Sequence, residues 1–319
     1  MPAKIRPLTR RNLHGVWSAL IVPWTDRDEL DATRYTAEVR SYAGTGVHGV
    51  YTGGTTGEFY AQDDRTYERI TRITCEQAHD IGLPVQIGVS ALSTRTTRQR
   101  IRVALKAGAD AIQVALPFWL ELKDDEVKRF VHEVAAEAGK VPIILYLTSR
   151  SKRKIEPALF GELAAEVPTF IGTKDTGASV KKVRAMLKQA PDIAIFGGED
   201  FYERIPAGGR GGYCSVTGFN APKIVELYEL CAAGWLRKAK PLATAVDRFL
   251  HQALIPLVRE EGLWDSAVDR IQRVAGGGDV GLRCQSPYRS GTPKHVEQVL
   301  AWCRKHTPEL LPRPAKRRR

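Results

Sequence analysis

The chain is poor in the residues that hold metals and disulfides. It has an odd number of cysteines, five, and no two of them form a CxxC pair; they are Cys75, Cys214, Cys231, Cys284 and Cys303. The seven histidines show neither HxH nor HxxxH spacing. Scattered thiols of this kind indicate free cysteines in a reducing cytoplasm rather than a disulfide framework or a zinc site. We therefore expect a cytoplasmic protein with no bound metal.

Long apolar runs are also missing. No run approaches the roughly 18 apolar residues that a membrane-spanning helix needs. The first eleven residues, which read MPAKIRPLTRR, lack the apolar core of a secretory signal. The sequence therefore predicts neither a membrane protein nor a secreted one.

Acidic residues are outnumbered, and the formal net charge is +12. Nine of the 48 basic residues lie in two end segments, residues 1–12 and 313–319. Without those nine, 39 basic residues face 36 acidic ones, so the body of the chain is almost balanced. We expect both ends to be disordered basic tails, and we expect no specific nucleic-acid partner.

Strand-like apolar runs recur at intervals of roughly thirty residues. Helical patterns separate them, and tight turns rich in glycine, proline and aspartate join the units. The predicted strands are 15–22, 47–51, 84–89, 111–115, 142–146, 169–172, 193–196 and 212–216. Near-continuous apolar strands are typical of parallel sheets covered on both faces. Eight evenly spaced units favour a (β/α)8 TIM barrel over an open doubly wound sheet.

The strand signal stops after about residue 233. Three amphipathic helices follow, predicted over 236–257, 265–274 and 293–306. We therefore divide the chain into an N-terminal tail (1–12), the barrel (13–235), a C-terminal helical appendix packed on the barrel (236–312) and a C-terminal tail (313–319).

A lysine follows the sixth predicted strand, in the stretch Phe170-Ile-Gly-Thr-Lys174-Asp175. Burial at a strand end lowers the pKa of a lysine and leaves part of the amine neutral and nucleophilic. Such an amine attacks carbonyl groups and forms a Schiff base. An alternative interpretation is a lysine that extends to solvent or pairs with Asp175.

Two other strand ends carry polar groups. The second strand runs into Gly53-Gly54-Thr55-Thr56-Gly57-Glu58, where hydroxyl and N–H groups can hold a carboxylate or relay a proton. The fifth strand ends at Tyr146, whose hydroxyl can shuttle protons. Taken singly, the first is also a turn with a helix cap, and the second a core tyrosine. Because all carboxyl-terminal strand ends of a barrel meet on one face, the three together predict one site.

These residues resemble the dihydrodipicolinate synthase / N-acetylneuraminate lyase family. The resemblance rests on Gly53–Glu58, Tyr146 and Gly172-Thr-Lys174-Asp175, with further matches at residues 18–23, 198–200 and 214–222. It covers the chain from about Gly15 to Leu310 and implies a class I lyase that needs no metal or other cofactor.

The resemblance also assigns roles. Lys174 would form an imine with pyruvate or another 2-oxo acid, Tyr146 would act as general acid/base, and Thr55 would belong to the proton relay. Substrate would contact Gly54, Thr56, Cys214, Arg150 and Glu199. The family further implies a homotetramer built from dimers.

The chain departs from the synthase pattern at three positions. Phe118-Trp119 stands where synthases have a Tyr-Tyr pair, and Leu147-Thr148-Ser149 replaces Asn-x-Pro after Tyr146. Arg150 comes one residue before the carboxylate-binding arginine of synthases. These departures weigh against a true dihydrodipicolinate synthase and leave imine formation untouched.

Four basic residues, Arg150, Lys152, Arg153 and Lys154, follow the fifth strand. They form either a solvated loop or an anion-attracting patch, and the latter would indicate a second carboxylate or phosphate on the substrate. Glu199 and Asp200 would instead suit a hydroxylated substrate. The leading hypothesis is a Schiff-base lyase of hydroxylated 2-oxo acids, with aldolase and dehydratase chemistry both open. The alternatives are the lysine-pathway synthase and a non-catalytic protein that binds a 2-oxo acid.

Overall fold

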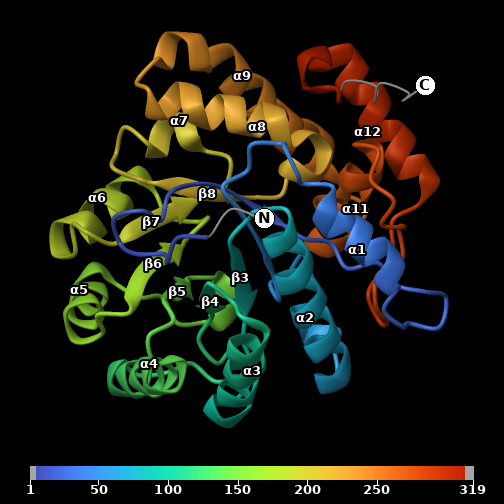
Figure 1. Cartoon of the computed structure of the whole chain (residues 1–319). Helices are drawn as coiled ribbons and strands as arrows, with labels where there is room; N and C mark the ends of the chain where they lie inside the picture. The colour runs from blue at the N-terminus through green and yellow to red at the C-terminus, as the bar shows by residue number, and fades with distance from the viewer. Residues whose placement is uncertain (1–4, 313–319) are drawn as a thin grey trace.

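The computed structural model describes residues 5–312 and contains a closed barrel of eight parallel strands. Each strand pairs with its sequence neighbours, and β8 closes the ring onto β1 (Figure 1). The strands are β1 (Gly15–Ala19), β2 (Gly49–Thr52), β3 (Val85–Gly88), β4 (Ala111–Val114), β5 (Ile143–Tyr146), β6 (Phe170–Lys174), β7 (Ala194–Gly197) and β8 (Gly211–Cys214). The predicted TIM barrel is confirmed.

Helices follow the strands and surround them (Figure 1). They are α1 (Ala32–Arg40), α2 (Asp64–Asp80), α3 (Thr94–Ala107), α4 (Asp124–Ala138), α5 (Pro157–Glu166), α6 (Val180–Gln189), α7 (Phe201–Arg204) and α8 (Thr217–Ala232), with short turns η1 (Phe59–Ala61) and η2 (Ser149–Ser151). The side chains of Asp31 and Asp63 accept hydrogen bonds from the first turns of α1 and α2, as their positions before apolar periodic patterns indicate.

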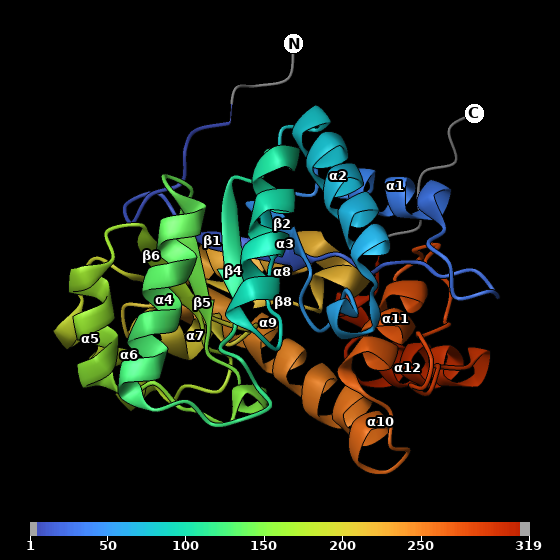
Figure 2. The same cartoon turned by 90° about the horizontal axis from the view of Figure 1, so that it is seen from below.

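The C-terminal helices are α9 (Leu236–Arg248), η3 (Phe249–Leu254), α10 (Ile255–Arg259), α11 (Asp265–Ala275), α12 (Pro293–His306) and η4 (Pro308–Leu310). Helix α9 packs against α7 and α8, whereas α11 and α12 lie on the side of the barrel that carries α1, away from α4 and α5 (Figure 2). The single helix expected over 236–257 is interrupted, because η3 is a π-helical turn. Pro256 lacks the N–H that would bond to the carbonyl of Gln252 in a regular α-helix, and this loss favours the irregular turn.

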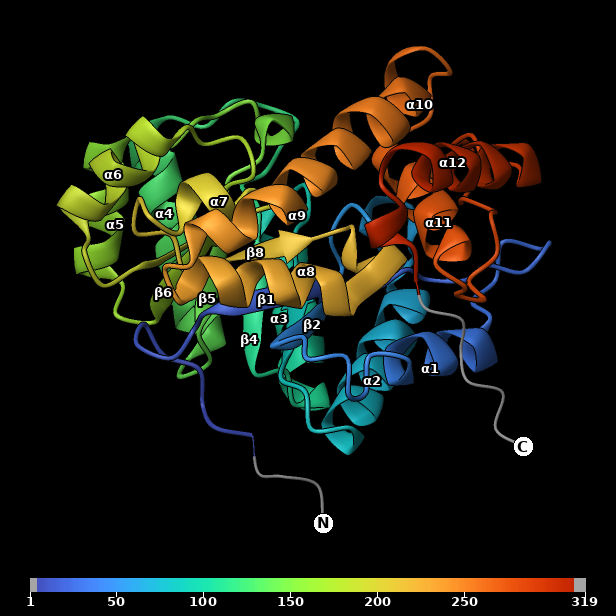
Figure 3. The same cartoon turned by 90° about the horizontal axis from the view of Figure 1, so that it is seen from above.

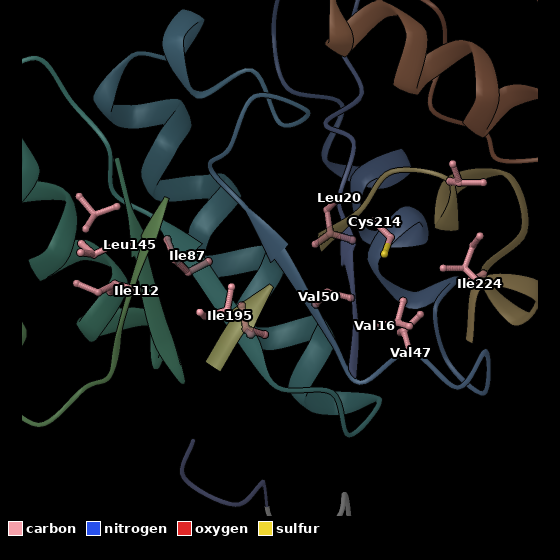
Figure 4. Close-up of a cluster of buried hydrophobic side chains, with 14 of the residues drawn as sticks. Val16, Leu20, Val47, Val50, Ile87, Ile112, Leu145, Ile195, Cys214 and Ile224 are labelled. Atoms are coloured by element: carbon pink, nitrogen blue, oxygen red, sulfur yellow. The ribbon is translucent and has the colours of Figure 1, made fainter. Parts of the chain in front are cut away.

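The core has two layers, separated by the barrel wall. Side chains alternate along the strands, so Val16, Val50 and Ile195 face the helices, as Figure 4 shows. Their neighbours Trp17, Tyr51 and Phe196 face the barrel interior, together with Leu8, Leu13, Ala19, Ala111, Ile144, Ile171, Ala194 and Tyr213. On β6 a register shift against β5 at Ile171 interrupts the alternation, and both Ile171 and Lys174 face inward.

The N-terminal segment is ordered from residue 5, so the expected tail is wrong for residues 5–12. Leu8 and Leu13 belong to the interior cluster of the barrel. The Arg10 guanidinium donates to the carbonyl oxygens of Phe170 at 3.1 Å and Ala164 at 2.7 Å. The basic segment 313–319 lies outside the described residues.

Within residues 5–312, no helix is long and apolar enough to span a membrane. The long C-terminal stretch from α9 to α10 instead runs along one side of the barrel, as Figure 3 shows. It packs against α8 and lines the cavity described below.

Candidate active site

Lys174 ends β6 at the carboxyl-terminal face of the barrel, paired in register with Tyr146 at the end of β5. The lysine is only 6% exposed. Its Nζ donates to the Tyr51 hydroxyl at 3.0 Å and lies 4.4 Å from the centroid of the Tyr146 ring. The ring centroid of Tyr213 is 5.5 Å from Nζ. Three aromatic rings therefore surround the amine, and their faces favour its ammonium form.

The pKa of Lys174 is raised, whereas the sequence led us to expect a lowered pKa. Burial does lower this pKa, but Tyr51, Tyr146 and Asp269 together raise it by more, so it lies above its ordinary value. For Tyr146, burial raises the pKa, but Lys174 and a hydrogen bond with Thr55 lower it by more, so it lies below its ordinary value. The pair thus favours an ammonium beside an unusually acidic phenol.

Asp175, the alternative partner for Lys174, binds other residues instead. Asp175 accepts a hydrogen bond from Lys182 Nζ at 3.0 Å, and its carbonyl oxygen accepts one from Arg204 at 2.9 Å. Asp175 therefore fixes the start of the loop before α6. That helix begins at Val180 behind the capping Ser179.

The loop after β2 brings Thr55 and Thr56 to the same face. Gly53 starts the turn with φ +73°, and a Cβ at this position would lie 2.5 Å from the carbonyl oxygen of Gly88, so only glycine fits. Within the described chain, the backbone N–H groups of Thr55 and Thr56 donate to no other group. Two unpaired N–H groups beside a buried ammonium form a place for a carboxylate.

Glu58 anchors this loop to the C-terminal helices. It is completely buried, and its carboxylate accepts hydrogen bonds from Arg270 of α11, the Trp24 indole and the Gln285 N–H. Arg270 is equally buried and also donates to the carbonyl oxygen of Val22 at 2.6 Å. Helix α11 therefore positions the Thr55–Thr56 loop through an ion pair that water does not reach.

Replacing Arg270 with methionine is expected to lower the free energy of unfolding by about 3–5 kcal/mol, because Glu58 would remain buried without its cation. Urea denaturation measures the change. The matched control is Arg283→Met, since Arg283 pairs with Asp28 but is 40% exposed, and should cost at most about 1 kcal/mol. Adding Glu58→Gln should recover much of the loss. Equal losses of stability in Arg270→Met and Arg283→Met would contradict the structural role given to the Arg270–Glu58 pair.

Asp269 is a site residue that the sequence analysis missed. It lies on α11, one residue before Arg270, and is 7% exposed. Thr56 Oγ1 donates to its Oδ2 at 2.6 Å, and Gln272 Nε2 donates to its Oδ1 at 2.9 Å. Burial raises the pKa of Asp269 to about 7, and the nearby charges of Asp265 and Glu199 act in the same direction.

A cavity of about 900 Å³ opens above Lys174. Tyr51, Thr55, Thr56 and Tyr146 line its base. Further out, the charged residues of the lining are mainly acidic; they are Glu199, Asp200, Glu203, Asp247, Asp265 and Asp269, against Lys174 and Lys240. Among residues 5–312, no group of histidine, cysteine, aspartate and glutamate side chains is arranged to hold a metal ion.

Glu199 lies in this cavity, where the sequence analysis placed a substrate-binding residue. Its Oε1 accepts the N–H of Val216 at 2.8 Å. Burial raises the pKa of Glu199, although backbone N–H groups of the β8 end partly oppose this effect. A carboxyl group fixed in this way can accept hydrogen bonds from substrate hydroxyls.

A second cavity, of about 230 Å³, lies on the other side of Thr55 and Tyr146. Its walls are mostly aromatic; they include Phe59, Tyr60, Phe118, Trp264 and Tyr288. Arg150 lines this smaller cavity and not the larger one, and its guanidinium pairs with Asp265 at 2.8 Å.

Two other predicted contacts lie away from the large cavity. Cys214 is the residue after Tyr213 on β8, so its side chain faces outward into the apolar layer under the helices (Figure 4). Its thiol is fully buried 3.7 Å from the carbonyl oxygen of Gly198. Gly54 does not line the cavity either, and its carbonyl oxygen accepts the N–H of Phe59. Neither arrangement supports the predicted substrate contact.

Comparison with known proteins agrees with this geometry. Residues 12–259 match the Dihydrodipicolinate synthetase family. The 4-hydroxy-tetrahydrodipicolinate synthase of Methanopyrus kandleri is 32% identical over 77% of this chain and 81% of its own length. The N-acetylneuraminate lyase of Salmonella paratyphi B is 25% identical over 75% and 80%.

Solved structures share the fold. The prophage protein YagE of the dihydrodipicolinic acid synthase family from E. coli K12, in complex with pyruvate, superimposes with a TM-score of 0.83 at 23% identity, over 92% of this chain and 98% of its own. CdNal from Clostridium difficile, in complex with mannosamine, gives 0.82 at 20% identity, over 92% and 99%. With a family match over most of its length and a 32% identical relative, this chain belongs to the dihydrodipicolinate synthetase family.

Proposed function

We propose that this Schiff-base lyase joins Lys174 to the carbonyl carbon of pyruvate or of a hydroxylated 2-oxo acid. The observation that carries the proposal is the position of the amine. Lys174 Nζ lies at the base of a 900 Å³ cavity, between two tyrosines and next to a loop with two unpaired N–H groups. A 2-oxo acid offers a carbonyl to the amine and a carboxylate to the loop.

Imine formation begins with a proton transfer. The ammonium of Lys174 has to lose a proton before it can attack, and the phenolate form of Tyr146, which the neighbouring Lys174 stabilises, is placed to accept it and leave a neutral amine. The amine attacks the carbonyl carbon while Tyr146 returns the proton to the carbonyl oxygen, which gives a carbinolamine with two protons on its positive nitrogen. Tyr146 then takes one of these protons and gives it to the hydroxyl group, which leaves as water, so that the protonated imine forms. Thr55, hydrogen-bonded to Tyr146, orients the phenol.

The imine activates the next carbon of the substrate. Its positive nitrogen accepts electrons, so a proton or a carbon fragment can leave that carbon and generate an enamine. Release of a carbon fragment is an aldol cleavage, and release of a neighbouring hydroxyl is a dehydration. The proposed chemistry includes both.

The lining of the cavity favours a hydroxylated substrate. Six acidic side chains face this space, and hydroxyl groups donate hydrogen bonds to carboxylates, whereas a second substrate carboxylate or phosphate would be repelled. The basic loop after β5 offsets only one of these charges, that of Asp265, and its other paired cations are engaged elsewhere. Arg150 pairs with Asp265, Arg153 pairs with Asp124, and Lys152 donates to the carbonyl oxygen of Trp119. We therefore abandon the proposal of an anionic tail on the substrate.

Turnover of a panel of 2-oxo acids tests the function. The panel contains 2-keto-3-deoxy sugar acids of five and six carbons, N-acetylneuraminate, and pyruvate with aspartate semialdehyde. Pyruvate release is followed with coupled lactate dehydrogenase, and loss of water by mass spectrometry. We expect turnover of a hydroxylated 2-oxo acid. Binding without turnover of any member would support a non-catalytic 2-oxo acid binding protein instead.

The synthase activity remains the second candidate, because the Methanopyrus kandleri relative carries that name at 32% identity. Condensation of pyruvate with aspartate semialdehyde would favour it. Against it, Trp119 occupies the position of the relay tyrosine of synthases, is 73% exposed and has no phenol proton to donate.

Assembly and location are part of the proposal. Exposed Trp119 and Leu120 lie on the loop before α4, and Trp264 lies just before α11. These apolar side chains support a homo-oligomer, and the family resemblance favours a tetramer built from dimers. All five cysteines are free and buried, which supports a cytoplasmic location.

A further inference from the structure

Asp269 is hydrogen-bonded to Thr56, whose backbone N–H group belongs to the proposed carboxylate site. Each of its carboxyl oxygens has one partner: Oδ1 accepts from the Gln272 amide, and Oδ2 lies 2.6 Å from Thr56 Oγ1. Because Gln272 can only donate at that position, a proton on the carboxyl group belongs on Oδ2, facing Thr56. The protonation state of Asp269 therefore decides which of the two groups donates.

The two states present different groups to a substrate. When Asp269 is ionised, Thr56 must give its hydroxyl hydrogen to Oδ2, and only lone pairs of Oγ1 point elsewhere. When Asp269 is protonated, the acid donates to Oγ1, and the hydroxyl hydrogen of Thr56 is free to turn toward the cavity. Only the second state adds a donor beside the unpaired N–H groups of Thr55 and Thr56.

We propose that Asp269 is a positioning residue that couples the binding of a 2-oxo acid to the uptake of one proton. The substrate carboxylate binds the N–H groups of Thr55 and Thr56 together with the freed Thr56 hydroxyl, while protonation removes the negative charge of Asp269 from beside it. The inference rests on the proposed function, because it requires that the carboxylate of a 2-oxo acid occupies this loop.

The surroundings place this titration in the neutral range. Burial raises the pKa of Asp269 to about 7, and Asp265 and Glu199 also raise it, while Thr56 and Gln272 lower it. Lys174 interacts with Asp269 and remains an ammonium across this range, since its pKa is above the ordinary value. The other titratable groups that line the cavity are Tyr51, Tyr146, Asp200, Tyr202, Glu203, Tyr213, Lys240, Asp247 and His251. On the same helix, Arg270 pairs with Glu58 and Arg273 with Glu38.

Calorimetric titration with pyruvate tests the coupling. Titrations in buffers of different ionisation enthalpy give the number of protons bound with the ligand, and a series from pH 6 to pH 9 gives the affinity. We expect the parent protein to take up nearly one proton at pH 8 and to lose affinity about tenfold per pH unit above roughly 7.5. Asp269→Asn, which donates permanently to Thr56, should take up no proton and keep its affinity within about twofold.

Two further variants make the result specific. Thr56→Val removes the hydroxyl and should reduce the gain in affinity at low pH. Asp265→Asn removes a carboxylate from the same helix, one turn away, and should retain the proton uptake while moving it to lower pH, because Asp265 raises the pKa of Asp269.

Asp269→Asn and the parent must also differ in how their stability depends on pH. The raised pKa means that the folded parent holds a proton that the unfolded chain has lost between about pH 4 and pH 7. Its stability relative to Asp269→Asn should therefore fall as pH rises through that window.

Equal proton uptake by the parent and Asp269→Asn, or affinity of the parent that does not change with pH, would overturn the inference while leaving the proposed function intact. Trapping of the pyruvate imine with borohydride in the same samples separates the two ideas. Absence of both the adduct and the binding heat would overturn both.

Discussion

Replacing Lys174 with arginine is expected to abolish imine chemistry while the fold survives. The guanidinium keeps the positive charge and can still donate to the Tyr51 hydroxyl, but it stays protonated and cannot act as a nucleophile. Removal of a covalent nucleophile lowers kcat by roughly 10⁴-fold or more in enzymes where it has been dissected. Steady-state turnover of the best substrate in the panel measures the loss, and circular dichroism verifies the fold.

The outcome distinguishes covalent from purely electrostatic catalysis. If the charge of Lys174 only attracted the substrate carboxylate, arginine would serve nearly as well. Residual activity of Lys174→Arg within tenfold of the parent would therefore refute the imine mechanism. No such activity is expected, because the amine is the group aimed at the cavity base.

Tyr146→Phe is expected to lower kcat by about 10²- to 10⁴-fold, the usual contribution of a positioned general acid/base. The substitution keeps the ring 4.4 Å from Lys174 Nζ but removes the phenol that exchanges protons with it. Imine formation should still occur, only slowly, so the time course of borohydride trapping should lengthen while its end point on Lys174 is retained. Stopped-time trapping followed by mass spectrometry measures both.

The matched control is Tyr35→Phe. Tyr35 is more deeply buried than Tyr146 and its hydroxyl is 2.6 Å from that of Thr74, but it lies outside the cavity lining. We expect its kcat to stay within about twofold of the parent. Equal losses in the two variants would mean that the effect of Tyr146→Phe comes from lost packing rather than lost proton transfer.

The barrel itself was predictable from the sequence. Strands covered on both faces are continuously apolar, and helices with capping aspartates and amphipathic patterns separate them, so the eightfold repeat is visible without coordinates. Helix α12 begins and ends at the predicted residues. Lys174, Tyr146 and Thr55 also meet as expected, because the barrel brings all carboxyl-terminal strand ends to one face.

The orientation of single side chains was harder to predict from the sequence. A strand that is apolar on both faces does not reveal which residues point inward, and one position of register separates Tyr213 in the interior from Cys214 in the outer layer. The same uncertainty concealed Tyr51, which contacts Lys174 from β2. The direction of the Lys174 pKa depended on those tyrosines, so burial alone gave the wrong sign.

Contacts between segments far apart in the chain could not be predicted from the sequence for a different reason. Asp269 is 213 residues from Thr56 along the chain, and nothing in its own helix indicates a partner. The only available signal is the polar content of α11, where Ser266, Asp269, Arg270 and Gln272 are all buried. Buried polar side chains need partners, so such a helix indicates a polar interface, but only the fold shows that the interface is with the Thr55–Thr56 loop.

The most direct test of the account is reduction with borohydride in the presence of pyruvate, followed by intact mass and peptide mapping, beside a Lys174→Ala control. The account predicts a stable adduct on the peptide that contains Lys174, and none in the control. A folded protein that forms no adduct, or one that forms it on another lysine, would contradict the central claim that Lys174 is the Schiff-base residue.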